Sequence, residues 1–454
     1  MTARMLRRNS TDPAQEESHG SRIFYSVAGS AITPLMSLAT APILAQCLGV
    51  TGRGELAAGM APMLFAVAVG ALGVPEALTF YVARRARGAR RAVRRAFGIL
   101  TILGAIAGAF VALSAPVLAD GNAEVEQLIM VTAFLTIPTF WASIPNSVLA
   151  GTHAWKKSAL MDFALSILRL VLLSALAISG HLVPLTATVV MLGLPLIKGL
   201  LTLPYLIEYR RGTTNVTAKR VRLFNYGSRL WVGSLAGIVL LRLDQLLMIP
   251  LAGPVQLGLY AVAVSLGEVP AALAGAVRNV VFSSDAGRSH DREDMRRLQQ
   301  TARLTSAAAG LASIGIGVLL PWAIPMFFGA SFGSAIAVTW VILAGVTLGT
   351  PGSVAGAGLS ARGRPGLRSW GMVIGAIANT AVLFMTVPTL GAMGAALSTL
   401  VGNIVAGTMN IVWLRTHFGM GLRGFYGLRS QDIQLVLKTL ARTTGKKKVD
   451  AFSN

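Results

Sequence analysis

Long apolar runs separated by short polar segments fill the chain from residue 23 to residue 415. A helix needs about 20 mainly apolar residues to cross roughly 30 Å of hydrocarbon. Twelve segments meet that requirement: 23–48, 56–82, 96–119, 127–150, 158–179, 182–207, 229–252, 257–283, 303–328, 333–360, 367–389 and 391–415. The pattern therefore predicts an all-α polytopic membrane protein with twelve transmembrane helices.

The composition also indicates a membrane protein. The 454 residues are 54% hydrophobic and 13% charged, with a mean hydropathy of +0.65. These values are far from those of an ordinary soluble domain. The formal net charge of +22 would suit nucleic acid, but the basic residues lie between the apolar runs rather than on an aromatic-rich polar face. We expect membrane lipids as partners and no nucleic acid.

The basic residues gather in alternate loops, and this sets the expected orientation. They occupy the N-terminal tail 1–22, the even-numbered loops, including the central loop 208–228, and the C-terminal tail 416–454. The odd-numbered loops hold only Arg53 among the cations. Cytoplasmic loops are enriched in Lys and Arg, so we expect a multi-pass protein of the cell (plasma) membrane with both termini in the cytoplasm.

Two basic segments have a second interpretation. The run RRARGARRAVRR from Arg84 is interpreted as a cytoplasmic anchor, with a phosphate-binding cluster as the alternative. The segment SQDIQLVLKTLAR from Ser430 has apolar residues at helical spacing. It predicts an amphipathic helix on the inner leaflet, with a partner-docking helix as the alternative.

An internal repeat divides the chain into two halves. LGVTGRGELAA from Leu48 aligns with AGPVQLGLYAV from Ala252, which pairs Gly54 with Gly258 at an offset of 204 residues. A second match, at offset 211, pairs Lys157 with Arg368. Since each half holds six predicted spans, the halves enter the membrane in the same direction. We expect two six-helix lobes, 23–207 and 229–415, that a pseudo-twofold axis relates, with a cavity between them.

Ionisable residues inside the spans are candidates for binding, because each is unfavourable in lipid unless it faces other helices or water. There are eight: Glu76, Asp162, Arg169, Lys198, Arg242, Asp244, Glu268 and Arg278. Arg169, Arg242, Asp244 and Glu268 lie deepest, and the others lie nearer the expected cytoplasmic side. Arg242 and Asp244 lie about 200° apart around a helix, so they need partners on different helices. Structural ion pairs within a lobe remain an alternative to ligand binding.

No motif of an enzyme or metal site is present. The sequence has no Walker A run, no HExxH and no G-x-S-x-G, and its five histidines lie outside the predicted spans. Its one cysteine, Cys47, excludes an internal disulfide. We expect no catalytic activity, no cofactor and no metal.

Three stretches of the sequence resemble a known family. They are RLDQLLMIPLAGPVQLGLYAVAVSLGEVPAAL from Arg242, LAQCLGVTGRGELAAGMAPMLFAVAVGALGVPEAL from Leu44, and LGAMGAALSTLVGN from Leu390. The first is similar to the start of the second lobe in polysaccharide flippases of the multidrug/oligosaccharidyl-lipid/polysaccharide export superfamily. There an acidic residue precedes a glycine turn and a Gly-x-Tyr-x-x-Ala, as Asp244, Gly253, Gly258, Tyr260 and Ala263 do here.

The resemblance implies a MATE-like fold and a flippase function. Such a protein moves a polyprenyl-pyrophosphate-linked oligosaccharide from the inner to the outer leaflet by alternating access, for cell-surface polysaccharide biosynthesis. The first, second, seventh and eighth spans would line the cavity. The candidate substrate-binding residues are Arg242, Asp244, Glu268, Arg278, Glu76 and Arg169. Arginines would bind phosphate, and carboxylates would meet sugar hydroxyls or a coupling cation.

Other functions remain open at this point. Related peptidoglycan-precursor flippases have fourteen spans and arginines in the first span, which this sequence lacks. A cation-coupled multidrug exporter of the same fold would use Asp244 or Glu268 and would need no arginine in its cavity. A major-facilitator carrier would show an acidic residue in the basic second loop, where none stands. A scaffold for glycan assembly is the remaining alternative, and other glycan-assembly membrane proteins are candidate partners.

Overall fold

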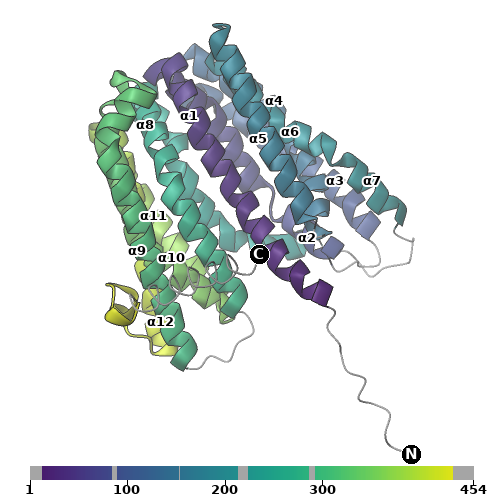
Figure 1. The fold of residues 1–454 in the computed structure, drawn as a ribbon. Helices are drawn as coiled ribbons and strands as arrows, with labels where there is room; N and C mark the ends of the chain where they lie inside the picture. Colours follow the sequence, from purple (N-terminus) through teal and green to yellow (C-terminus); the bar gives the residue numbers. More distant parts are fainter. Residues whose placement is uncertain (1–12, 84–88, 153, 213–222, 286–291, 433–454) are drawn as a thin grey trace, which may run out of the picture.

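The computed structural model describes residues 13–83, 89–152, 154–212, 223–285 and 292–432, and these residues form helices and short connections without strands (Figure 1). The helices are α1 (Pro13–Gly70), α2 (Val74–Ala83), α3 (Ala89–Ala119), α4 (Ala123–Gly151), α5 (Trp155–Ile178), α6 (Pro184–Leu201), α7 (Leu203–Gly212), α8 (Leu223–Asp285), α9 (Arg292–Ala323), α10 (Ala335–Ala361), α11 (Pro365–Leu390) and α12 (Ala392–Phe418). Three short helical turns complete them: η1 (Ile324–Phe328), η2 (Ala330–Phe332) and η3 (Leu422–Phe425). The predicted all-helical membrane fold is confirmed.

Within these residues, nine helices are long and apolar enough to cross a membrane, or ten if the bent pair 36–70 and 74–83 counts as one span. This count does not confirm the predicted twelve. The difference arises because α1 contains the first predicted span and most of the second, and α8 contains the seventh and eighth. Several predicted features lie outside the described residues: the tail up to residue 12, part of the arginine run from Arg84, part of the loop 208–228, and the amphipathic segment beyond Asp432.

Helices α1 and α8 each break at one glycine. Gly49 has φ 67° and ψ −175°, and Gly253 has φ 81° and ψ 173°. A positive φ is unfavourable for residues with a β-carbon, so glycine allows the chain to change direction there without leaving a long loop. The two breaks lie 204 residues apart, at the offset of the sequence repeat. The boundaries between the predicted span pairs fall at these breaks.

Helices α1 and α8 meet backbone to backbone just after the breaks (Figure 1). A β-carbon added to Gly54 would lie 1.8 Å from the carbonyl oxygen of Pro254, and one added to Gly258 would lie 2.0 Å from that of Val50. The contact is reciprocal, since each glycine faces the residue that follows the other helix's break. A two-fold axis between the helices has this signature.

The outer helices present apolar side chains away from the bundle. Ile102, Ile106 and Phe110 recur every four residues along α3, and each is 62–63% exposed. Small residues instead fill the helix contacts inside, as at Gly352 of α10, where a β-carbon would lie 2.0 Å from the Cα of Gly407 in α12. Apolar residues outside and small residues inside are the arrangement that lipid favours.

The segment after α12 folds back onto α9. Arg303 donates from Nε and Nη2 to the carboxylate of Asp432, at 2.7 and 2.8 Å, and from Nη1 to the carbonyl of Gly424, at 2.6 Å. Phe425 beside this pair is fully buried. The hydrogen bond from Arg303 holds the pKa of Asp432 below its usual range. Residues 419–432 are therefore fixed to the first half of α9.

We predict that Gly258→Ala destabilises the protein by about 1–3 kcal/mol, because the new methyl group overlaps the backbone of α1. Unfolding by SDS in mixed micelles would measure the change. Gly98→Ala is the control, since a β-carbon there meets no described atom within 4 Å. Equal stability of the two variants would contradict the close contact.

We predict that Asp432→Asn releases residues 419–432 from α9, since it leaves Arg303 buried without its carboxylate. Breaking such a buried pair costs about 3–5 kcal/mol. Tryptic cleavage after Arg423 and Arg429 should accelerate in the variant. The pKa of Asp432 is lowered in the folded state, so its stabilisation is complete above the ordinary aspartate pKa of about 4 and disappears as the pH falls through the lower folded value. Amide exchange of residues 421–425 should show this pH dependence in wild type and lack it in the variant.

Candidate functional site

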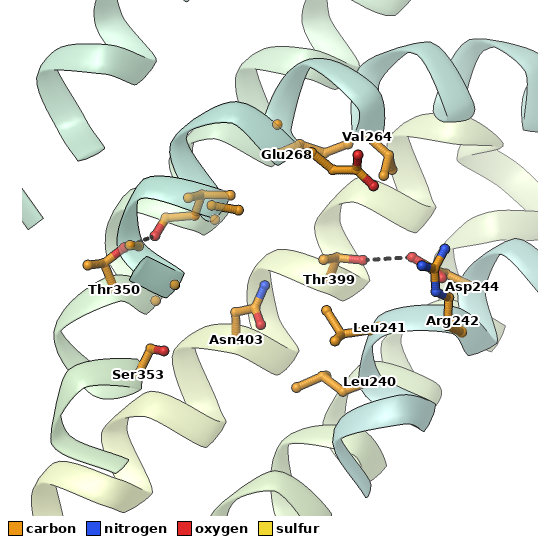
Figure 2. Close-up of a pocket in the computed structure, with 18 of the residues that line it drawn as sticks. Leu240, Leu241, Arg242, Asp244, Val264, Glu268, Thr350, Ser353, Thr399 and Asn403 are labelled. Carbon is orange, nitrogen blue, oxygen red and sulfur yellow. Dashed lines mark hydrogen bonds between the residues drawn. The ribbon is translucent and has the colours of Figure 1, made fainter. Parts of the chain in front are cut away.

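A cavity of about 370 Å³ lies among α8, α10 and α12 (Figure 2). Its wall mixes apolar side chains, such as Leu241 and Ile342, with hydrogen-bonding ones, such as Ser353 and Asn403. Within the described part of the chain, all its lining residues belong to the second half, and none comes from α1 or α2. We expected the first and second spans to line the cavity together with the seventh and eighth. The first two spans do not line this cavity, because helices of the second half enclose it.

The cavity brings together four of the six predicted site residues: Arg242, Asp244, Glu268 and Arg278. They come from the two parts of α8, on either side of the break at Gly253. The break turns one part of the helix against the other, so residues up to 36 positions apart reach the same cavity. Arg242 and Asp244 line it at one side, and Glu268 lies across from them (Figure 2).

Asp244 is buried and bound by neutral donors. The hydroxyl of Tyr260 donates to its Oδ2, and Thr399 Oγ1 of α12 donates to the same oxygen at 3.2 Å. The backbone N–H of Gln245 donates to Oδ1 at 2.7 Å. Tyr260 and Thr399 also lie 3.0 Å apart, oxygen to oxygen. The three side chains thus join both parts of α8 to α12 without an ion pair.

Arg242 is exposed in the cavity wall. Its only hydrogen bond to a described side chain is a long one, 3.5 Å to Oε1 of Gln245. Glu268 lies within electrostatic range of Arg242 and also of Arg53, which α1 supplies from the first half of the chain. Nε of Arg53 is buried and has no hydrogen-bond partner among the residues that the structure describes.

Arg278 lines the cavity farther along α8, and its Nη1 donates to Ser353 Oγ of α10 at 3.2 Å. Among the described residues, no salt bridge within 4.0 Å involves Arg242, Asp244, Glu268 or Arg278. Asp244, Arg242 and Arg278 therefore have neutral hydrogen-bond partners, and the arginine guanidinium groups retain N–H donors for a ligand.

The other two predicted residues lie elsewhere. Glu76 is exposed in the first turn of α2. Arg169 of α5 is half-buried against α1, with Nη2 3.5 Å from Ser37 Oγ, and its buried Nε meets no acceptor in the described ranges. The first half instead contains an ion pair between Lys198 and Asp162, at 2.7 Å, which ties α6 to α5. In the described part of the chain, no group of three His, Cys, Asp or Glu residues is arranged to hold a metal.

Sequence reasoning misses three contributors to this site: Tyr260, Thr399 and Arg53. The sequence marks Tyr260 only as part of the glycine-tyrosine pattern, although a buried tyrosine usually finds a hydrogen-bond partner. Thr399 has no distinguishing signal, since it is 155 residues from Asp244. Arg53 falls in a predicted loop, and its neighbour Glu268 can be identified only from the contact between α1 and α8.

The sequence matches a family model described as "Polysaccharide biosynthesis protein" over residues 20–282, more than half of the chain. The chain belongs to this family. The matched region includes most of α8 and all four charged residues of the cavity. No curated protein sequence matches the chain significantly.

Solved structures of two kinds share the fold. The structure of the lipid II flippase MurJ in an inward closed conformation has a TM-score of 0.68 and 16% sequence identity, covering 89% of each chain. An inward-facing multidrug resistance MATE transporter of the MOP superfamily has a TM-score of 0.64 and 17% identity, covering 87% of this chain and 100% of its own. The MATE multidrug transporter DinF-BH has a TM-score of 0.61 and 14% identity, covering 90% of this chain and 96% of its own. The family and these neighbours place the chain among membrane transporters and flippases.

We predict that Tyr260→Phe lowers the free energy of unfolding by about 1–3 kcal/mol, because Asp244 loses a buried hydrogen-bond donor. Tyr205→Phe is the matched control, since the Tyr205 ring contacts Lys157 and its hydroxyl has no hydrogen-bond partner among the described residues. SDS unfolding of both variants measures the difference. In a double variant with Asp244→Asn the effects should not add, and additive effects would contradict the coupling of the two residues.

Proposed function

We propose that this protein flips a polyprenyl-pyrophosphate-linked oligosaccharide from the inner to the outer leaflet of the plasma membrane. The observation that supports this most directly is Arg242, a guanidinium group exposed in the wall of a membrane cavity without a salt bridge to any acid that the structure describes. Arginine forms strong, often bidentate hydrogen bonds with phosphate oxygens. Membership of the polysaccharide biosynthesis family agrees with a substrate that carries a glycan.

The physical task explains the mixed lining of the cavity. A glycan and a charged pyrophosphate are excluded from hydrocarbon, because their polar groups would lose water without new partners. The side chains of Asn403, Ser353 and Gln245 offer such partners to sugar hydroxyls, and the neighbouring leucines cover the apolar faces of sugar rings. The polyprenyl tail would stay in lipid during transfer. No bond is made or broken in this transfer.

Alternating access would come from two lobes, 23–207 and 229–415, moving about the glycine contact of α1 with α8. In this proposal both termini face the cytoplasm, and Arg169 and Glu76 act from the first lobe when it closes over the substrate. Arg53 is positioned to contribute in the same way, because its charge already acts on Glu268. Other membrane proteins of glycan assembly would deliver the substrate.

A cation-coupled multidrug exporter is the second candidate. Asp244 favours it, since a buried carboxylate with hydroxyl neighbours is the type of group that binds a coupling ion. The MATE proteins that share the fold are described as multidrug transporters. Exposed Arg242 weighs against it, because a cationic drug would be repelled from that wall.

We predict that Arg242→Ala reduces flipping at least about tenfold, the loss expected when one charge-assisted hydrogen bond is removed. The assay is translocation of a fluorescent polyprenyl-pyrophosphate-linked oligosaccharide in proteoliposomes, at matched protein insertion. Arg296→Ala is the control, since Arg296 is an exposed arginine on α9 away from the cavity.

Loss of transport in the Arg242 variant alone supports the flippase. Equal transport by both variants would remove Arg242 from the substrate path. If wild type does not move the glycan but exports small cations with a proton or sodium gradient, the exporter is the correct function.

A further inference from the structure

Two arginines from different helices converge at the end of the cavity where α8 ends and α11 begins. Arg278 of α8 donates to Ser353 Oγ of α10. Cγ and Cδ of Arg368, in the first turn of α11, lie 3.3 and 3.4 Å from the point where a β-carbon on Gly356 would stand. Ser353 and Gly356 are three residues apart and so lie on one face of α10. The guanidinium groups are close enough to repel each other.

No described carboxylate compensates this pair. Among the described residues, neither arginine forms a salt bridge, and both side chains are half-buried. Along α8, Glu268 lies ten residues before Arg278 and Asp285 seven residues after it, which is about 15 Å and about 10 Å along a helix axis. Two like charges that are close together and partly removed from water repel each other. A bound anion would offset this repulsion.

The surroundings supply further hydrogen-bond donors. Arg368 stands in the first turn of a 26-residue helix, whose N-terminal N–H groups and dipole favour a negative charge. The absence of a side chain at Gly356 lets Arg368 and Asn410 pack against α10, since a β-carbon there would lie 2.8 Å from Nδ2 of Asn410. The hydroxyl of Ser353 lines the cavity beside Arg278. Residues of four helices, α8, α10, α11 and α12, thus meet beside the two arginines at the edge of the cavity.

We propose that Arg278 and Arg368 together bind one phosphate or pyrophosphate group of an amphiphile, at the end of the cavity. This inference rests on the proposed function in one respect: the group would be the pyrophosphate of the glycan carrier, which would contact Arg278 and Arg368 at one stage of the transfer and Arg242 at another. The same chemistry would suit the phosphate of a bilayer phospholipid. Arg278, in the wall of the cavity, is the inner of the two ligands. Arg368, in the first turn of α11, is the outer one.

The test is binding of farnesyl pyrophosphate to the full-length protein in nanodiscs of phosphatidylcholine. Arg278→Gln and Arg368→Gln should each weaken binding about tenfold or more, since each removes charge-assisted hydrogen bonds to phosphate. Arg364→Gln is the control, because Arg364 is an exposed arginine just before α11. Without the probe, the two variants should be at least as stable as wild type, since each relieves repulsion. If the two arginines had only a structural role, both variants would be less stable than wild type without the probe.

A second arm identifies the source of the phosphate. In this arm, phosphatidylglycerol replaces phosphatidylcholine in the nanodiscs. If the affinity for the probe stays the same, the site is assigned to the carrier; if it falls, the lipid competes with the probe and the site is assigned to a phospholipid. Both results support a phosphate site. The proposal is overturned if Arg368→Gln binds the probe as tightly as Arg364→Gln, if wild type does not bind it, or if both variants lose stability without it.

The outcome is separable from that of the transport assay. If probe binding depends on both arginines but the wild-type protein moves no glycan, the phosphate site is supported and the proposed flippase function is wrong. If transport depends on Arg242 but Arg368→Gln does not change probe binding, the flippase function is supported and the phosphate site is wrong.

Discussion

The backbone contact between α1 and α8 at Gly54 and Gly258 determines how the two halves of the chain meet. Lipid gives helices little hydrophobic reason to associate, so close van der Waals packing between small residues has to hold them together. Each glycine faces the start of the other helix beyond its break, and a side chain on either would overlap backbone. Because α8 also supplies Asp244, Glu268 and Arg278, the same contact fixes the helix on which the cavity depends.

The charges of the cavity follow from the exclusion of water. Asp244 is buried and stable where it is because Tyr260 and Thr399 of two different helix segments donate to it. Arg242 and Arg278 have only weak or neutral partners among the described residues, so their donors are available to a ligand. Neutral hydrogen-bond partners keep Arg242 and Arg278 in place without a salt bridge among the described residues, and the proposed function depends on the N–H donors that this leaves available.

Much of the architecture could be predicted because its signals are local. Apolar runs of helical length predicted the membrane helices, and the predicted span ends at 48 and 252 fall next to the breaks at Gly49 and Gly253, which lie at the offset of the repeat. The number of spans is harder to obtain from the helices themselves, since α1 and α8 continue through two predicted spans each. For the site, the cost of charge in lipid selected eight residues, and four of them, Arg242, Asp244, Glu268 and Arg278, line one cavity; their role in binding stays a prediction. The same rule also selected four residues that do not line it, because depth in a span does not determine the face of the bundle: Glu76, Asp162, Arg169 and Lys198.

The sequence by itself is enough to establish a helical membrane protein with an internal repeat and a few charged residues inside its spans. Helix length, hydropathy and the tolerance of glycine for positive φ are local properties, so short stretches of sequence reveal them. Which charges share a cavity, and which neighbours hold them, is settled by the packing of the helices. Thr399 reaches Asp244, and Arg368 reaches Arg278, because the crossing of four helices brings together side chains 155 and 90 residues apart. Such contacts depend on helix packing in three dimensions, for which a single sequence has no local signal.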